Sequence, residues 1–212
     1  MCRLLYVNSK NKFDIKKHLL KFSLLCKSSK EYQGHGWGCA YLRNGEWKYY
    51  KNILPIWEDN LMQFGEATRL LVHARSAFQD KDIFVENNMP FYDDKYIFIF
   101  NGELRGVKIN SEGRIGAEKI FNYIKRFDKG DMFAALKKSV EIIKKRTDYI
   151  RAMNIIILDE QQAYVASVFN EDPKYFTMLK KETEENQIIC SAAYPNETDW
   201  KKIENNFIGV IK

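Results

Sequence analysis

The sequence contains few of the residues that form disulfides or metal sites. Its 212 residues include four cysteines and three histidines, and no Cys-x-x-Cys pair occurs. Zinc ligands normally come as closely spaced pairs, and a long chain with few cysteines rarely relies on disulfides. We therefore expect reduced thiols, no metal site and no other cofactor.

Long hydrophobic runs are also absent. The longest runs have about five residues, whereas a helix needs ~20 apolar residues to cross a bilayer. The first ten residues turn polar too early for the core of a signal peptide. We therefore expect a protein that has no membrane segment and is located in the cytoplasm.

Proline and glycine are too scarce for a fibrous or low-complexity chain, with 4 and 11 residues respectively. Hydrophobic residues make up 45% of the chain and charged residues 29%, close to the averages for soluble domains. The net charge is +6, and basic residues concentrate at 10–30 and 119–146. We interpret them as solvated helix faces, so no nucleic-acid partner is expected and a small or anionic partner fits.

The order of the sequence patterns predicts one α+β domain across residues 1–212. Strand patterns come first, two helical stripes follow and strands return, so strands and helices do not alternate regularly. Asn44-Gly45 between two β-rich runs predicts a hairpin. We expect helices at 13–26, 58–65, 117–127 and 133–143, and strands at 3–7, 39–42, 46–50, 69–75, 96–100, 153–158, 163–169, 175–179, 187–190 and 207–211. The helices would lie outside two antiparallel sheets.

Cys2 is the position that says most about chemistry. Cellular removal of Met1 generally requires a small second residue, and cysteine qualifies. The freed α-amine would have a reference pKa of about 7.7–8.0, against about 8.5 for the thiol. A neutral amine can therefore act as the general base for the thiol beside it. The alternative is that Cys2 is only a small residue on a buried first strand.

Five motifs occur in an order that resembles the class II glutamine amidotransferases of the N-terminal-nucleophile hydrolase superfamily, in particular their stand-alone members. They are Cys2-Arg3-Leu4-Leu5, Gly34-His35-Gly36-Trp37-Gly38-Cys39-Ala40-Tyr41, Val72-His73-Ala74-Arg75, Asn88-Met89-Pro90-Phe91 and Phe98-Ile99-Phe100-Asn101-Gly102-Glu103-Leu104. Ile189-Cys190-Ser191-Ala192-Ala193 and Asp199-Trp200 extend the resemblance to essentially the whole chain. The resemblance implies a four-layer α-β-β-α sandwich, in which two stacked antiparallel sheets are flanked by helices.

The resemblance also implies an amide hydrolase that releases ammonia from glutamine. Cys2 would attack the side-chain amide and form a thioester that water hydrolyses. Asn101 and Gly102 would supply the oxyanion donors, and Arg75 would hold the substrate's α-carboxylate as a planar clamp. The ammonia would be released or used by an acceptor protein. From the residues alone, Asn101-Gly102 could instead be a type I′ turn, and Arg75 a surface residue at a strand end.

Some positions depart from the family pattern or carry no chemistry. Where the family has an aspartate for the substrate's α-ammonium, the sequence has Gly116. Either another acid substitutes, or the substrate is a different γ-glutamyl amide or peptide, or the domain is a degenerate scaffold or regulatory module. The acids nearest in sequence are Asp80, Glu86 and Glu103. We interpret Gly34, Gly36 and Gly38 as positions of close backbone approach rather than a phosphate loop, and His73 as structural.

Overall fold

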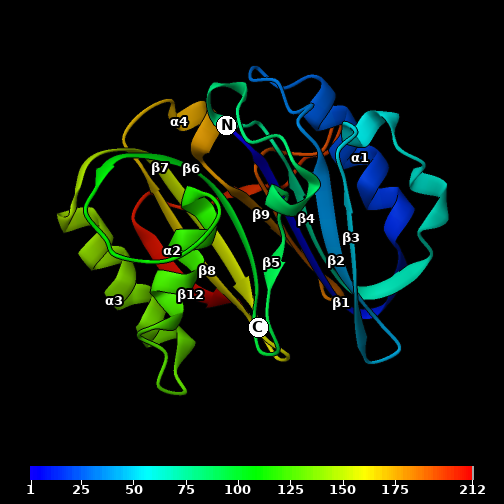
Figure 1. Ribbon diagram of the computed structural model, residues 1–212. Coiled ribbons are helices and arrows are strands. Elements are labelled where there is room, and N and C mark those ends of the chain that lie inside the picture. Colours follow the sequence, from blue (N-terminus) through cyan, green and yellow to red (C-terminus); the bar gives the residue numbers. More distant parts are fainter. Residues whose placement is uncertain (212) are drawn as a thin grey trace. The chain divides into compact units, whose positions relative to one another are not determined.

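The computed structural model describes residues 1–211, which divide into two compact units. The first comprises Met1–Pro90 and Thr177–Ile203, and the second comprises Phe91–Phe176 and the segment that begins at Glu204. Each unit contains one antiparallel sheet with helices packed on it (Figure 1). The predicted α+β class with two antiparallel sheets is confirmed, whereas the organisation of residues 1–212 as one domain stays a prediction.

The sheet of the first unit has the strand order β11-β9-β10-β1-β4-β2-β3. Its strands are β1 (Arg3–Asp14), β2 (Trp37–Arg43), β3 (Glu46–Asn52), β4 (Glu66–Ala74), β9 (Leu179–Glu182), β10 (Asn186–Cys190) and β11 (Lys201–Lys202). β1 lies between β4 and β10 and pairs with both. Because Arg3 pairs with Ala74, the residue before β1 lies next to the end of β4.

Helix α1 (Ile15–Lys27) follows β1 directly and packs against the sheet of the first unit. Asp14 caps its first turn by accepting a hydrogen bond from the backbone N–H of Lys16 at 3.0 Å. The predicted apolar stripe is buried, with Leu19 and Phe22 in the same core as Leu5 of β1. The helical spacing in the sequence is thus explained by burial of one face.

The connection between β2 and β3 confirms the predicted hairpin. Asn44 and Gly45 both have positive φ, 52° and 82°, as a type I′ turn requires. After β3 the chain forms two 3-10 turns, η1 (Ile56–Glu58) and η2 (Leu61–Gln63). The single helix predicted for 58–65 is therefore wrong, because Asn60 starts a second turn by accepting from the N–H of Met62.

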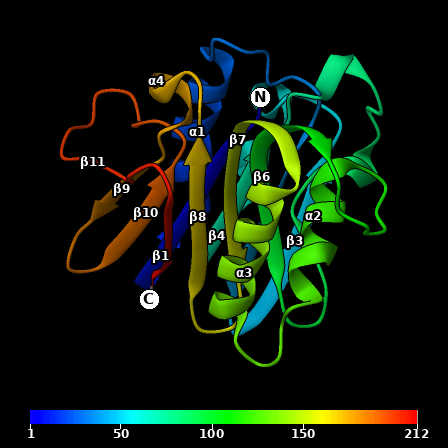
Figure 2. The same ribbon diagram turned by 90° about the vertical axis from the view of Figure 1, so that its left-hand side faces the viewer.

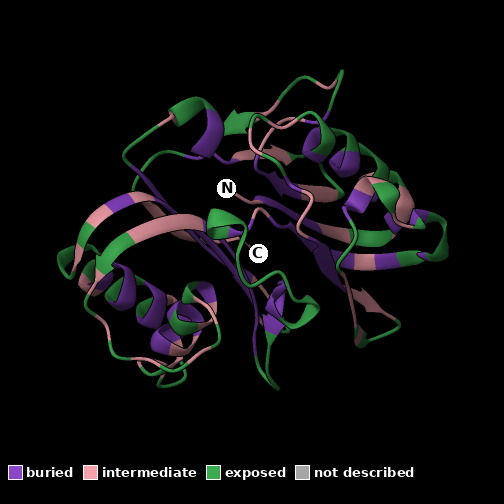
Figure 3. Cartoon of the chain, turned by 45° about the horizontal axis from the view of Figure 1, so that its top comes forward, coloured by how far each residue is buried: buried purple, intermediate pink, exposed green. Residues whose placement is uncertain are grey.

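The second unit contains the strand order β12-β8-β7-β6-β5. Its strands are β5 (Phe91–Tyr92), β6 (Ile97–Val107), β7 (Thr147–Leu158), β8 (Ala163–Phe169) and β12 (Phe207–Ile211). Figure 2 shows α2 (Gly116–Lys125) and α3 (Met132–Lys145) side by side on one face of this sheet. Phe121 of α2 stacks on Phe98 of β6 with ring centroids 4.9 Å apart. Buried residues gather in the strands of both sheets (Figure 3).

Two predicted boundaries in the second unit are wrong. Strand β6 does not end at Phe100 but continues to Val107, because the long strand β7 offers it a partner over nearly its whole length. Asn101 and Gly102 therefore lie inside a paired strand and do not form a turn. Helix α4 (Pro173–Phe176) occupies the start of the strand predicted for 175–179, and it begins at a proline, which favours the first position of a helix.

Candidate active site

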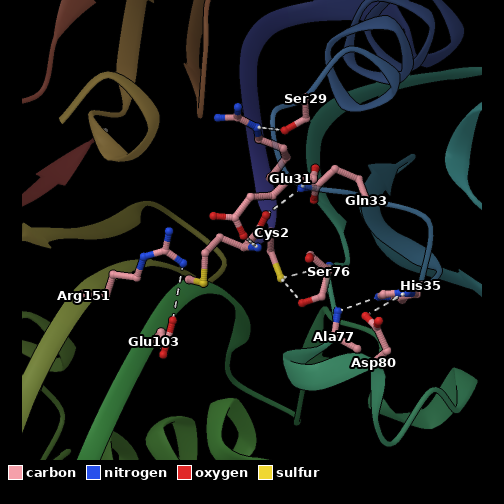
Figure 4. Close-up of polar contacts among 12 residues, drawn as sticks. Cys2, Ser29, Glu31, Gln33, His35, Ser76, Ala77, Asp80, Glu103 and Arg151 are labelled. Atoms are coloured by element: carbon pink, nitrogen blue, oxygen red, sulfur yellow. Dashed lines mark hydrogen bonds and ion pairs between the residues drawn. The ribbon is translucent and has the colours of Figure 1, made fainter. Parts of the chain in front are cut away.

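Cys2 lies immediately before β1, beside the backbone that follows β4. Its Sγ accepts a hydrogen bond from the N–H of Ser76 at 3.5 Å and donates to the Ser76 carbonyl at 3.7 Å (Figure 4). The side chain is half-buried and its sulfur is a free thiol. The antiparallel pairing of β1 with β4 brings residues 2 and 76 together, so sheet register positions the sulfur.

Burial raises the pKa of the Cys2 thiol above its ordinary value. The terminal ammonium, the N–H of Ser76 and the guanidinium of Arg75 each lower it in part, and the carboxylate of Glu31 raises it further. The thiol is therefore neutral near pH 7 and needs a base before it can act as a nucleophile.

The residue before the thiol is held by two polar side chains. The α-ammonium of Met1 forms an ion pair with the carboxylate of Glu31. The carbonyl of Met1 accepts a hydrogen bond from Nε2 of Gln33 at 2.6 Å. The sequence analysis did not single out Glu31 and Gln33. The feature that could have indicated them is an acid and an amide just before the Gly34–Gly38 segment.

Arg75 follows β4 directly and is only 5% exposed. Its guanidinium donates to the carbonyl of Asp82 at 2.9 Å, to the carbonyl of Phe84 at 3.5 Å and to Oδ1 of Asn88 at 3.4 Å. Burial lowers the pKa of Arg75, and the nearby Cys2 partly opposes this effect. Arg75 is thus no surface residue, and it ties the segment 82–88 to the end of β4.

His35 supports the same segment from another side. Its Nδ1 accepts a hydrogen bond from the N–H of Ala77 at 2.8 Å, and its Nε2 lies 3.5 Å from Oδ1 of Asp80. Its backbone N–H donates to the carbonyl of Arg75 at 3.1 Å. Burial lowers the pKa of His35, so the neutral ring acts as an acceptor that orients the backbone around the Cys2 contact.

Gly36 and Gly38 allow close approach of other backbone segments, as the sequence predicted, whereas a Cβ on Gly34 would meet the side chain of Tyr32. A Cβ on Gly36, which has φ of +98°, would lie 2.1 Å from Nδ2 of Asn88 and 2.7 Å from the carbonyl oxygen of Asn52. A Cβ on Gly38 would lie 2.5 Å from the carbonyl oxygen of Met89. These positions exclude any side chain.

Asn101 is a buried amide without a hydrogen-bond partner among residues 1–211. It is 1% exposed, and neither its Nδ2 nor its Oδ1 is bonded within that range. Its cross-strand neighbour Asn154 is equally buried, yet it donates to the Phe176 carbonyl at 2.7 Å and accepts from the Ser167 hydroxyl at 3.0 Å. An unpaired buried amide costs stability, which favours a functional role for Asn101.

Gly102, the second predicted oxyanion donor, follows Asn101 on β6. A Cβ at this position would lie 2.2 Å from the backbone oxygen of Ala152 on β7. The strand pairing alone therefore requires glycine here. This packing requirement is compatible with a role of the Gly102 N–H in catalysis.

The acids nominated from the sequence are differently placed. The carboxylate of Glu103 binds Arg105 at 2.7 Å and Arg151 at 3.4 Å, so its charge is already neutralised. Asp80 is 81% exposed and faces His35, and Glu86 is exposed. Gly116 starts α2, and a Cβ at this position would meet no atom of residues 1–211 within 4 Å beyond its chain neighbours and the backbone of its own helix.

The structure brings Cys2 and Arg75 together in the first unit, and it places Asn101 and Gly102 next to each other in the second. That all four act on one substrate stays a prediction. Among residues 1–211, no group of three or more Cys, His, Asp and Glu side chains could hold a metal ion. In the same range, no helix has both the length and the apolarity that a membrane crossing needs.

Comparison with known proteins finds similarity only among solved structures, since no family model and no curated protein matches the sequence. A glutamine aminotransferase class-II domain protein from Silicibacter pomeroyi has a TM-score of 0.65 at 14% identity, covering 96% of this chain and 92% of its own. A predicted glutamine amidotransferase from Pseudomonas aeruginosa has a TM-score of 0.63 at 13% identity, covering 99% and 96%.

A third match is part of a larger enzyme. Glutamine phosphoribosylpyrophosphate amidotransferase from B. subtilis has a TM-score of 0.64 at 15% identity, covering 90% of this chain and 42% of that enzyme. The chain therefore spans less than half of this enzyme but nearly all of the other two. At such identities the similarity concerns the fold, and it confirms the fold that the motifs predicted. The chain has the N-terminal-nucleophile hydrolase fold of class II glutamine amidotransferase domains.

Proposed function

We propose that the protein is an amide hydrolase of the glutamine amidotransferase type, with Cys2 as its nucleophile after removal of Met1. The observation that carries this proposal is the Cys2 thiol, held on the backbone of Ser76 and next to the buried cation Arg75. Hydrolysis of an amide that also carries a carboxylate requires a thiol, a base next to it and a guanidinium that binds the carboxylate.

The reaction follows from the chemistry of the amino terminus. The neutral α-amine of Cys2 takes the proton of the thiol, and the thiolate attacks the side-chain carboxamide carbon of glutamine. The N–H groups of Asn101 and Gly102 stabilise the tetrahedral oxyanion. The α-ammonium returns its proton to the leaving nitrogen, ammonia departs and a thioester forms. Water, deprotonated by the same amine, attacks the thioester, which releases glutamate and restores the thiol.

Arg75 is proposed to bind the substrate's α-carboxylate. Its guanidinium stays charged at any physiological pH and can make two parallel hydrogen bonds to a carboxylate. Its present bonds to the carbonyls of Asp82 and Phe84 fix its orientation. We further propose that the ammonia is released or passed to an acceptor protein, that the protein acts in the cytoplasm, and that no cofactor is needed.

Gly116 supports a second candidate function. Because this position has no acid for the α-ammonium of free glutamine, a γ-glutamyl amide or peptide is the alternative substrate. A degenerate scaffold or regulatory domain is the third candidate, and the thiol, the arginine and the unpaired amide of Asn101 argue against it. Rates of ammonia release from glutamine and from γ-glutamyl amides distinguish the first two functions.

The test uses the full chain with and without its first methionine, each form defined by intact mass. The electrophilic glutamine analogue diazo-oxo-norleucine should add one label at Cys2 in the chain that lacks Met1 and none in the chain that keeps it. Cys2→Ala should abolish ammonia release while circular dichroism stays unchanged. Ammonia release by Cys2→Ala, or failure of the analogue to label the processed chain, would overturn the proposal.

A further inference from the structure

An ammonium group is bound beside the proposed nucleophile. The α-ammonium of Met1 pairs with the carboxylate of Glu31, and its carbonyl accepts a hydrogen bond from Nε2 of Gln33 (Figure 4). The same Nε2 donates to the backbone carbonyl of Glu31 at 2.8 Å, which holds the Gln33 side chain against this segment. The two side chains thus bind both polar groups of one residue.

Opposite charges act on the Cys2 thiol from two residues of the first unit. Arg75 supplies a positive charge from the position before Ser76, whose backbone contacts the thiol. Glu31 supplies a negative charge and pairs with the ammonium of Met1, the residue before Cys2. A free α-amino acid carries one carboxylate and one ammonium, so this pair of side chains complements its two charges. Position 116 offers no charge because it is glycine.

We propose that Glu31 binds the α-ammonium of the substrate once Met1 has been removed. This inference rests on the function proposed above and narrows it to substrates with a free α-amino group. In the chain that keeps Met1, the terminal ammonium occupies the same carboxylate, so the retained methionine blocks this subsite. Glu31 is thereby a specificity-determining residue of the reaction.

A different role of Glu31, holding the catalytic α-amine of Cys2, fits the chemistry less well. A carboxylate that pairs with an amine raises the pKa of that amine and keeps it protonated. A protonated amine cannot accept the thiol proton, so such a pair would suppress the base that Cys2 needs. Binding of a substrate ammonium by Glu31 carries no such cost.

The other candidate acids are less suited to an ammonium. The Glu103 carboxylate already binds the guanidinium groups of Arg105 and Arg151. Asp80 is largely exposed and faces His35, and an exposed carboxylate contributes little to binding a solvated cation. The Glu31 side chain is 25% exposed and pairs with the Met1 ammonium. Its carboxylate is therefore already partly removed from water before a substrate binds.

The test compares binding of L-glutamate and of glutarate, which lacks the amino group, to the full chain without Met1 by titration calorimetry. We expect the wild type to bind L-glutamate at least about tenfold more tightly than glutarate. Glu31→Gln should weaken L-glutamate about 10- to 100-fold and leave glutarate unchanged, since one charge-assisted hydrogen bond is lost. Glu46→Gln is the matched control, because Glu46 is an exposed acid of the first unit that pairs with Lys48.

Equal weakening of both ligands by Glu31→Gln, or of neither, would overturn the inference. If Glu31→Gln fails to fold, two further measurements decide. Glu31→Asp should keep part of the preference for L-glutamate, and the wild-type chain that keeps Met1 should bind L-glutamate at least about tenfold more weakly than the processed chain. Equal affinity of those two forms rejects the inference. Selective binding without ammonia release from glutamine would instead reject the proposed function and leave the amino-acid subsite in place.

Discussion

Truncating two buried asparagines on adjacent strands should change the free energy of unfolding by very different amounts. Asn101 and Asn154 are cross-strand neighbours, and both are 1% exposed. Within residues 1–211 the amide of Asn101 has no partner, whereas Asn154 bonds to Phe176 and Ser167. The two positions thus share burial and sheet context and differ in hydrogen bonding, which makes them a matched pair.

The expected magnitudes follow from that difference. Asn154→Ala leaves the Phe176 carbonyl and the Ser167 hydroxyl buried without a partner, which should lower the free energy of unfolding by about 2–6 kcal/mol at roughly 1–3 kcal/mol for each group. Asn101→Ala leaves no partner unpaired. Removing the unpaired amide stabilises the fold and losing its packing destabilises it, so the free energy of unfolding should change by less than about 1 kcal/mol. As an oxyanion donor, Asn101 should instead lower kcat about 10²–10³-fold when truncated.

The assay combines urea unfolding, followed by circular dichroism, with ammonia release by the chain that lacks Met1. A loss of about 2 kcal/mol or more corresponds to a midpoint shift of roughly 1 M urea for Asn154→Ala. Asn101→Ala should unfold near the wild-type midpoint. If Asn101→Ala is destabilised as much as Asn154→Ala, its amide is paired in solution and the reasoning fails. Wild-type ammonia release by a folded Asn101→Ala variant would refute the oxyanion role.

Three further outcomes are expected. Burial lowers the pKa of His18 to about 4, so between pH 6.5 and 4 the unfolded chain binds a proton that the folded chain does not. The free energy of unfolding should therefore fall by up to about 3 kcal/mol from pH 6.5 to 4. If the urea midpoint of His18→Gln falls with pH as steeply as that of the wild type, this reasoning is wrong. Gly102→Ala places a Cβ against the Ala152 carbonyl and should lower the free energy of unfolding by about 1–3 kcal/mol. Gly116→Ala, where a Cβ has room, should raise it by about 0.4–1 kcal/mol. Equal effects of the two substitutions in urea unfolding would contradict the close contact of Gly102 with β7. Burial raises the pKa of the Cys2 thiol above its ordinary value, so iodoacetamide should alkylate the chain that retains its first methionine slowly at pH 8 and faster above pH 9. A rate of Cys2 alkylation that levels off below pH 8, followed by peptide mass analysis, would refute a raised pKa.

Arg75 and His35 both bind the backbone of the segment between β4 and β5, in addition to any contact with the substrate. Their bonds to Asp82, Phe84 and Ala77 organise backbone that also carries the contact to the Cys2 thiol. A substitution at either position therefore changes the segment as well as any substrate contact. Kinetic effects of such variants need to be compared with proteolysis of residues 76–88, which reports the order of the segment by itself.

Local chemistry in the sequence was sufficient for several elements. The helical spacing of Leu19 and Phe22 predicted α1 because one face of a helix must be buried. Asn44-Gly45 predicted its hairpin because both residues tolerate positive φ. The ordered motifs around Cys2 and Arg75 predicted the fold, which the solved structures confirm.

Long-range pairing decided the rest. Strand β6 runs through Asn101 because β7 continues to pair with it, and no local pattern reports a partner about fifty residues away. The ion pair between Met1 and Glu31 likewise exists only once β1 and the segment before β2 have folded together. The sequence by itself determined which residues could do chemistry, through residue type and local periodicity. Tertiary structure decided which of them are buried, paired or left without a partner, because hydrogen bonds between distant residues depend on sheet register.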